Sequence, residues 1–143
     1  MEGSGSPPSY ADLSRGCLQE RDSRLVLEAF TVGSLPARMP DRNTHLTIGF
    51  ELQPPSGRTL YVAAEATDRG WSAYVTRGDG RQRLQAPQVG GRQLNLDLPT
   101  SALGGAQQLR WRVESSWLRS TLVSTAYAFD DAPNGGSSSY TRR

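Results

Sequence analysis

Lysine is absent from this chain, in which all 16 basic side chains are arginine. The absence excludes Schiff-base chemistry on a lysine side chain and the phosphate-binding lysine of a P-loop. The chain has one histidine, His45, and one cysteine, Cys17. A single chain therefore cannot form an internal disulfide or a structural zinc site of the Cys/His type. No apolar run approaches the roughly 18 residues that a membrane-spanning helix needs, so we expect no membrane-spanning segment.

The charge of the chain is close to balanced. Its 16 basic and 14 acidic residues leave a formal net charge of +2, and the two signs are interspersed. So small an excess disfavours binding to nucleic acid. The first residues, Met1 to Pro8, have neither the basic nor the apolar region of a secretion signal. We expect an extracellular or cell-surface location if an upstream signal peptide was removed, and a cytoplasmic one otherwise.

Alternation of apolar and polar residues is the strongest pattern present. It runs through 109–114, 44–52 and 58–67, where every second residue is mostly apolar. This period of two gives a β-strand one apolar and one polar face. Eight or nine short strands, with turn signals roughly every 8–12 residues, predict an all-β fold. The expected architecture is a two-sheet antiparallel β-sandwich, jelly-roll or immunoglobulin-like, with a closed barrel as the alternative.

The composition predicts one domain between two tails. Residues 1–9 are expected to form a flexible N-terminal tail, 10–133 the β-sandwich, and 134–143 a flexible Gly/Ser-rich C-terminal tail. Within the domain, four successive segments predict a meander: 44–52, 58–67, 71–76 and a short strand around Leu84. The connection 33–43 contains two prolines and is expected to be irregular. Residues 99–105 predict one helical turn.

Catalytic and metal-binding groups are sparse, and we predict no catalytic residue, metal site or cofactor. His45 lies on the polar face of its strand with no evident partner. An oxygen-only calcium site would have to use Asp130, Asp131 and Asn134, or Asp79, and neither spacing matches a calcium-binding loop. Cys17 is interpreted as a half-buried apolar residue of the first strand. The outward-facing, strand-borne carboxylates that glycoside hydrolysis would need are expected to pair with arginines on neighbouring strands instead: Glu28, Glu51, Glu65 and Glu114.

Aromatic side chains supply the candidate ligand-binding residues. Tyr61 and Tyr74 are out of phase with their apolar neighbours and are expected near each other on an exposed sheet face. Trp71 begins a strand and is expected to be partly covered, whereas Trp117 follows two serines at an expected strand end. Exposed rings on a rigid sheet stack against sugars or anchor protein partners. Trp111 is in phase with Leu109 and Val113 and is assigned to the core.

The C-terminal third carries a resemblance to a known class of module. Its sequence LRWRVESS (109–116) and its ending FDDAP (129–133), with DRGW (68–71) and NLDLP (95–99), are similar to β-sandwich modules of exported actinobacterial proteins. Those modules are akin to carbohydrate-binding sandwiches of the family 9 and DOMON kinds. The resemblance covers about residues 12–133 and implies fold more than function.

Two functions are compatible with these features. The first is a non-catalytic binding or accessory module that recognises carbohydrate or a cell-envelope polymer through Tyr61, Tyr74, Trp71 and Trp117. The second is a structural or adaptor subunit that docks a protein partner through an edge strand or a tail. The sequence leaves the oligomeric state and the ligand open.

Overall fold

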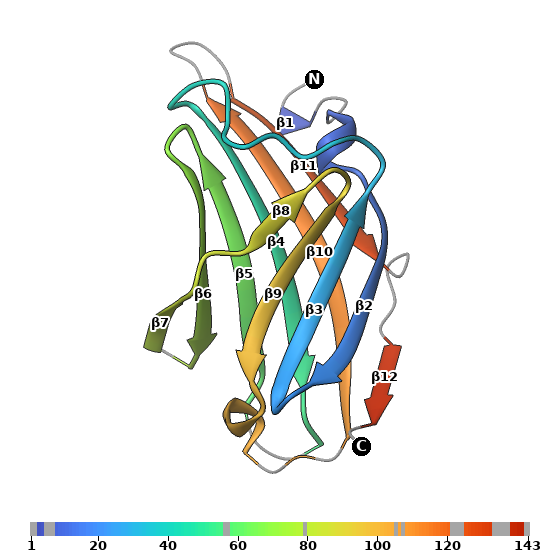
Figure 1. Cartoon of the computed structure of the whole chain (residues 1–143). Helices are drawn as coiled ribbons and strands as arrows, with labels where there is room; N and C mark the ends of the chain where they lie inside the picture. The colour runs from blue at the N-terminus through green and yellow to red at the C-terminus, as the bar shows by residue number, and fades with distance from the viewer. Residues whose placement is uncertain are drawn as a thin grey trace.

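The computed structural model describes residues 3–4, 8–55, 58–78, 80–104, 106, 108–120, 125–132 and 138–141, with the backbone alone described for 3–4, 120, 125–132 and 138–141. This part of the chain folds into two β-sheets that pack face to face (Figure 1). The prediction of an all-β, two-sheet sandwich is confirmed. No described helix is long and apolar enough to cross a membrane.

The larger sheet contains the predicted meander. Its strands are β1 (Gly3–Ser4), β4 (Thr44–Gln53), β5 (Leu60–Thr67), β6 (Gly70–Arg77), β7 (Gly80–Leu84), β10 (Gln108–Ser120), β11 (Thr125–Ala132) and β12 (Ser138–Thr141). Their order is β1-β11-β10-β4-β5-β6-β7, and β12 pairs with β10 beyond the end of β11. All pairs are antiparallel except β1 with β11.

The smaller sheet has the order β2-β3-β9-β8 and is antiparallel throughout. Its strands are β2 (Leu13–Arg21), β3 (Arg24–Thr31), β8 (Gln88–Gly90) and β9 (Gln93–Pro99). Between β2 and β3, Asp22 and Ser23 both have positive φ, 51° and 65°, as a two-residue type I′ hairpin turn requires. β3 is an interior strand of its sheet, in agreement with its apolar residues on both faces.

The core lies between the sheets and follows the predicted alternation. Every second residue of each central strand points inward and is buried, namely Leu46, Ile48, Phe50, Leu52, Val62, Ala64, Leu25, Leu27, Leu94, Leu96, Leu109 and Val113. Trp111 is also buried, as predicted, with its ring centroid 6.2 Å from that of Phe50. The outer faces therefore carry the remaining, largely polar, positions.

The connection 32–43 has no regular structure, as its prolines predict. It is nevertheless tied to both sheets. The backbone N–H of Leu35 donates to Gly91 beside β9, and that of Met39 donates to Thr67 at the end of β5, at 2.7 and 2.8 Å. Met39 itself is 1% exposed. The connection thus closes one end of the sandwich.

Two 3-10 helices lie near opposite ends of the sandwich (Figure 1). The first, η1 (Ser9–Ala11), is joined to β10 because the buried hydroxyl of Ser115 donates to the Ala11 carbonyl. The second, η2 (Thr100–Leu103), follows β9 where a helical turn is predicted, and it ends at Gly104 with φ 62°. That left-handed conformation is the one in which glycine costs least.

The structure departs from the sequence prediction at two short segments. Gly3–Ser4 pairs with β11 and Ser138–Thr141 pairs with β10, although both lie in the expected flexible tails. Strand pairing there is made by backbone groups and needs no apolar alternation, so the pattern does not reveal it. The rest of both predicted tails, apart from 8–9, lies outside the described residues.

Candidate functional site

The outer face of β5, β6 and β7 carries the two tyrosines selected from the sequence. Tyr61 and Tyr74 alternate with inward-facing residues of β5 and β6, so both side chains leave from the opposite face of the sheet. In the register Tyr74 lies opposite Ala63, two residues from Tyr61, which makes the tyrosines diagonal neighbours. The prediction that they lie near each other on one sheet face is confirmed.

Arginines from β7 complete this surface. β7 is the last described strand of the large sheet (Figure 1), and its register places Arg83 opposite Tyr74 and Arg81 opposite Thr76. We call the surface formed by Tyr61, Ser72, Tyr74, Arg81 and Arg83 the Tyr–Arg face. Part of it is hollowed by about 250 Å³, lined by Ser72, Ala73, Tyr74 and both arginines.

The Arg81 guanidinium lies over the Tyr74 ring, 3.6 Å from its centroid. This is a cation–π contact, and it leaves the guanidinium N–H groups free to turn toward a ligand. Arg81 also lies 3.9 Å from Glu65, a long ion pair between exposed groups. Burial, and then the charge of Glu65, raise the pKa of Tyr74, while Arg81 lowers it. The hydroxyl therefore stays protonated and able to donate a hydrogen bond.

Tyr61 is more enclosed than Tyr74. Its ring lies across Gly49 of β4, so closely that a Cβ at position 49 would stand 2.7 Å from Cε1 of the ring. Burial is the largest cause of the raised pKa of Tyr61. Electrostatic repulsion from Glu114, then from Tyr74 and Glu51, raises it further. Tyr61 thus supports the Tyr–Arg face by packing and offers little free ring surface.

The carboxylates of the larger sheet's outer face are close to arginines. Arg112 of β10 lies 3.7 Å from Glu51 on the neighbouring strand and 3.4 Å from Glu114 on its own. Glu65 is the carboxylate near Arg81. The prediction of an arginine partner on a neighbouring strand is confirmed for Glu51; the arginine of Glu114 lies on its own strand, and that of Glu65 lies two strands away on β7.

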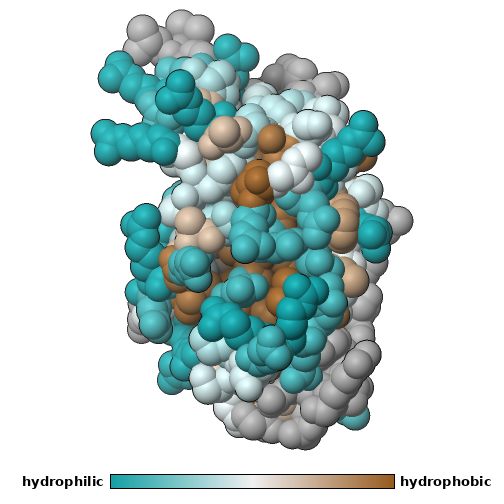
Figure 2. Space-filling view, in the orientation of Figure 1, coloured by the Kyte–Doolittle hydropathy of each residue, from teal (hydrophilic) through white to brown (hydrophobic). Residues whose placement is uncertain are grey.

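Glu28 lies on the other sheet, in a different setting. Its two carboxylate oxygens accept hydrogen bonds from the side-chain amides of Gln19 on β2 and Gln93 on β9, at 2.9 and 3.2 Å. Gln93 also donates to Asn95. Figure 2 views the molecule from the side of this smaller sheet, where hydrophobic residues show only between hydrophilic ones. The prediction of an arginine partner is wrong for Glu28, which has amide partners instead.

The prediction that Trp117 lies at a strand end is wrong. It lies within β10, not at a strand end, and its side chain faces inward opposite Leu46 with 9% exposed. Its indole Nε1 has no hydrogen-bond partner among the described residues. A buried ring on the inner face cannot join a ligand surface formed by Tyr61 and Tyr74.

Trp71 is partly covered, as expected, and also faces inward. Its indole N–H donates to the Pro36 carbonyl at 2.9 Å, so it fastens the 32–43 connection to β6. The ring packs against the core. Of the four predicted aromatic residues, only Tyr61 and Tyr74 therefore share a surface.

The structure describes only some of the remaining candidates. His45 lies on β4 opposite Leu118, and Cys17 is a half-exposed residue of β2. No cluster of three or more metal-ligating side chains occurs in the described part of the chain. Asp79 and Asn134 lie outside the described residues, as do the side chains of Asp130 and Asp131.

Sequence reasoning did not select Arg81 and Arg83. The available signal was their alternation in Gly80–Leu84 directly after the Tyr74 strand, which places both on one face of a hairpin. Comparison with known proteins adds no further assignment. No protein family matches this chain, and no curated protein or solved structure does so either.

Proposed function

We propose that this protein is a non-catalytic binding module that holds a carbohydrate or cell-envelope polymer on the Tyr–Arg face. The observation that carries the proposal is the hollow of about 250 Å³ in which the Tyr74 ring, Arg81 and Arg83 meet on rigid strands. Aromatic rings combined with a few placed polar groups are typical of surfaces that bind sugars and other polar ligands.

The arginines favour a polymer with acidic groups. Glu65 pairs with Arg81 only at the long distance of 3.9 Å, and Arg83 has no ion pair within the described residues. The hollow is therefore cationic, and guanidinium groups bind carboxylates and phosphates through paired hydrogen bonds. Because Arg81 covers one face of Tyr74, a sugar unit would contact the guanidinium and the ring edge instead of a bare aromatic face.

The adaptor hypothesis receives less support at the sheet edges that β7 and β8 form. β7 is five residues long with two outward arginines, and β8 has three residues. Short, charged edge strands are features by which natural proteins avoid pairing with other strands. We therefore place the contact on the face of the sheet.

The test compares retention on an acidic and a neutral polymer. Polygalacturonate is expected to retard the protein in affinity electrophoresis and dextran is not, with retardation falling as salt rises because exposed charges are screened. Arg81→Gln and Arg83→Gln are each expected to weaken binding about tenfold or more, as loss of one charged hydrogen bond implies. Tyr74→Ala is expected to weaken it as well, because it removes the ring and the hydroxyl donor.

The chain offers a matched control for these variants. Arg15 on β2 lies 3.9 Å above the Phe30 ring, the same kind of stack on the opposite sheet. Arg15→Gln removes the same charge and should leave retention unchanged. Equal losses in Arg15→Gln and Arg81→Gln would contradict the proposal, as would a stable oligomer in light scattering that buries the Tyr–Arg face.

A further inference from the structure

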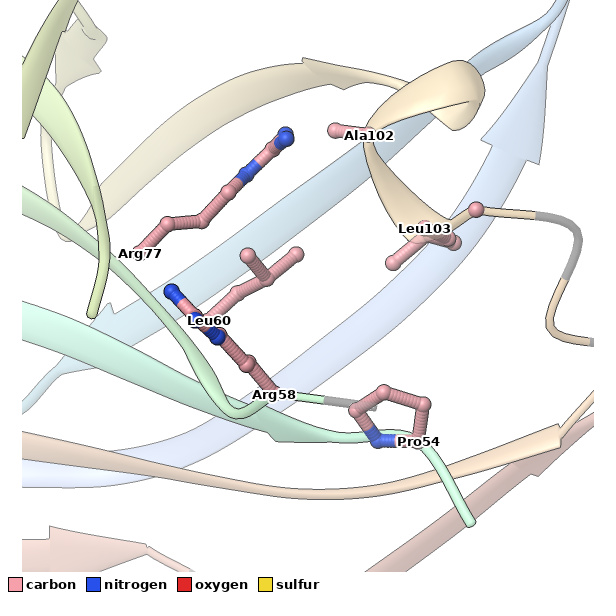
Figure 3. Close-up of a pocket in the computed structure, with 7 residues that line it drawn as sticks. Pro54, Arg58, Leu60, Arg77, Ala102 and Leu103 are labelled. Carbon is pink, nitrogen blue, oxygen red and sulfur yellow. The ribbon is translucent and has the colours of Figure 1, made fainter. Parts of the chain in front are cut away.

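A second hollow lies at the end of the sandwich where η2 follows β9. It measures about 280 Å³ and is lined by Pro54, Arg58, Leu60, Arg77, Ala102, Leu103 and Gly104. Figure 3 shows the Arg77 side chain extending from β6 toward Ala102. Leu60 and Arg58 are drawn below it. Arg77 is the last residue of β6, Arg58 lies two residues before β5, and both border an apolar floor.

Arg77 stands at a position where the alternation of β6 normally places a core residue. Arg77 pairs in register with Leu60, which is 3% exposed and faces the core. Arg58 precedes Leu60 by two residues. The period of two in β6 therefore directs the Arg77 stem to the inner side of the sheet, and Arg58 lines the same hollow. The opposing layer ends at Pro99 and continues as η2, so the guanidinium groups reach the mouth of a hollow instead of a packed sheet.

The Arg58 guanidinium lies against the turn after β6. A Cβ at position 78 would lie 2.6 Å from Arg58 Nη1. Gly78 also has φ 54°, which favours glycine. Neither Arg58 nor Arg77 has an ion pair or hydrogen bond with another residue in the described ranges. Two guanidinium groups that have no anionic partner among the described residues thus flank the pocket.

We propose that this pocket binds a small amphiphilic anion, in which a carboxylate or phosphate monoester is carried on a compact apolar body. The head group would accept hydrogen bonds from Arg58 and Arg77, because guanidinium matches both anions. The body would lie on Leu60, Ala102 and Leu103. The volume is just below the usual range of about 300–1,000 Å³ for ligand pockets, so the ligand is small. This proposal does not depend on polymer binding, since the pocket lies on the inner side of the sheet.

Four probes test the contributions of the charged head group and of the apolar ring separately. Benzoate and phenyl phosphate carry the two head groups on one ring, benzyl alcohol keeps the ring without charge, and sulfate keeps the charge without a ring. Titration calorimetry should show saturable binding of benzoate or phenyl phosphate, and the tighter of the two identifies the head group. Benzyl alcohol and sulfate should each bind at least about tenfold more weakly, because the first lacks the charged group and the second lacks the ring.

Variants locate the site. Arg58→Gln and Arg77→Gln should each weaken the tighter probe about tenfold or more. Ala102→Phe should abolish binding without changing charge, since its ring fills the hollow and Ala102 is only half-buried. Arg42→Gln, an exposed arginine of the 32–43 connection, should change nothing.

Three results would overturn the proposal: no saturable binding of either anion, equal binding of benzyl alcohol, or equal losses in Arg42→Gln and Arg77→Gln. Circular dichroism of each variant checks that the fold is retained. If Ala102→Phe fails to fold, the two arginine variants still decide, because both side chains are exposed.

Discussion

Replacing Gly49 by alanine tests whether the Tyr61 ring is held against the sheet as the structure describes. The added methyl group would overlap the ring, with Cε1 of Tyr61 only 2.7 Å from the new Cβ. Gly49 is buried in the interior strand β4, so the backbone has no room to yield and the ring must move. The Tyr–Arg face would then lose its support beside Tyr74.

The expected magnitude combines two opposing effects. Overpacking of this kind costs about 1–3 kcal/mol, whereas replacing glycine by alanine stabilises by about 0.4–1 kcal/mol through the unfolded chain. We expect Gly49→Ala to lower the free energy of unfolding by about 1–2 kcal/mol. Urea denaturation measures it as a lower midpoint with an unchanged slope.

The control is a second strand glycine. A Cβ at Gly90, on β8, would have no atom within 4 Å, so Gly90→Ala should be neutral or slightly stabilising. A double-mutant cycle with Tyr61→Ala then isolates the contact: once the ring is gone, Gly49→Ala should no longer destabilise. The reasoning is refuted if Gly49→Ala behaves like Gly90→Ala, or if its effect is the same with and without the Tyr61 ring.

Three further outcomes follow from other contacts. Ser115→Ala should cost about 1–3 kcal/mol in urea denaturation, because it leaves the Ala11 carbonyl without its buried donor. Trp71→Phe keeps an aromatic ring but removes part of the indole and its hydrogen bond to Pro36, so it should cost about 1 kcal/mol or more. The raised pKa of Tyr61 stabilises the folded state fully below pH 10.0, its ordinary value. That stability is lost as pH rises above it, so the unfolding free energy should fall there, and less steeply in Tyr61→Phe.

The fold was predictable from sequence where side chains alternate without interruption. In β4 the apolar residues recur at every second position, and β5 repeats this pattern with Ala63 as an extra apolar residue; the structure buries each of them. Trp117 was misplaced because Ser115 and Ser116 interrupt the apolar series, which reads as the end of a strand. The buried Ser115 hydroxyl is instead satisfied by the carbonyl of Ala11, 104 residues away, and no local pattern shows such a partner.

The candidate site was only half predictable for a similar reason. Tyr61 and Tyr74 are recognised because they break the phase of apolar strands. Arg81 and Arg83 can be recognised as site residues only from the register of β6 and β7, which brings them to Tyr74. From the sequence alone, arginines in a Gly-rich hairpin are indistinguishable from residues that keep an edge strand in solution.

The two arginine-lined hollows lie on opposite faces of one sheet. Variants at each hollow can therefore distinguish specific binding from general attraction of anions to a cationic chain. Arg81 lies on the outward face, whereas Arg77 enters the sandwich mouth. Arg81→Gln should therefore reduce retention on polygalacturonate and leave phenyl phosphate binding unchanged, and Arg77→Gln should do the reverse. Loss of both activities in both variants would mean that the net charge of +2, and not either surface, governs binding. Independent losses would require two separate sites, because each variant removes the same single charge.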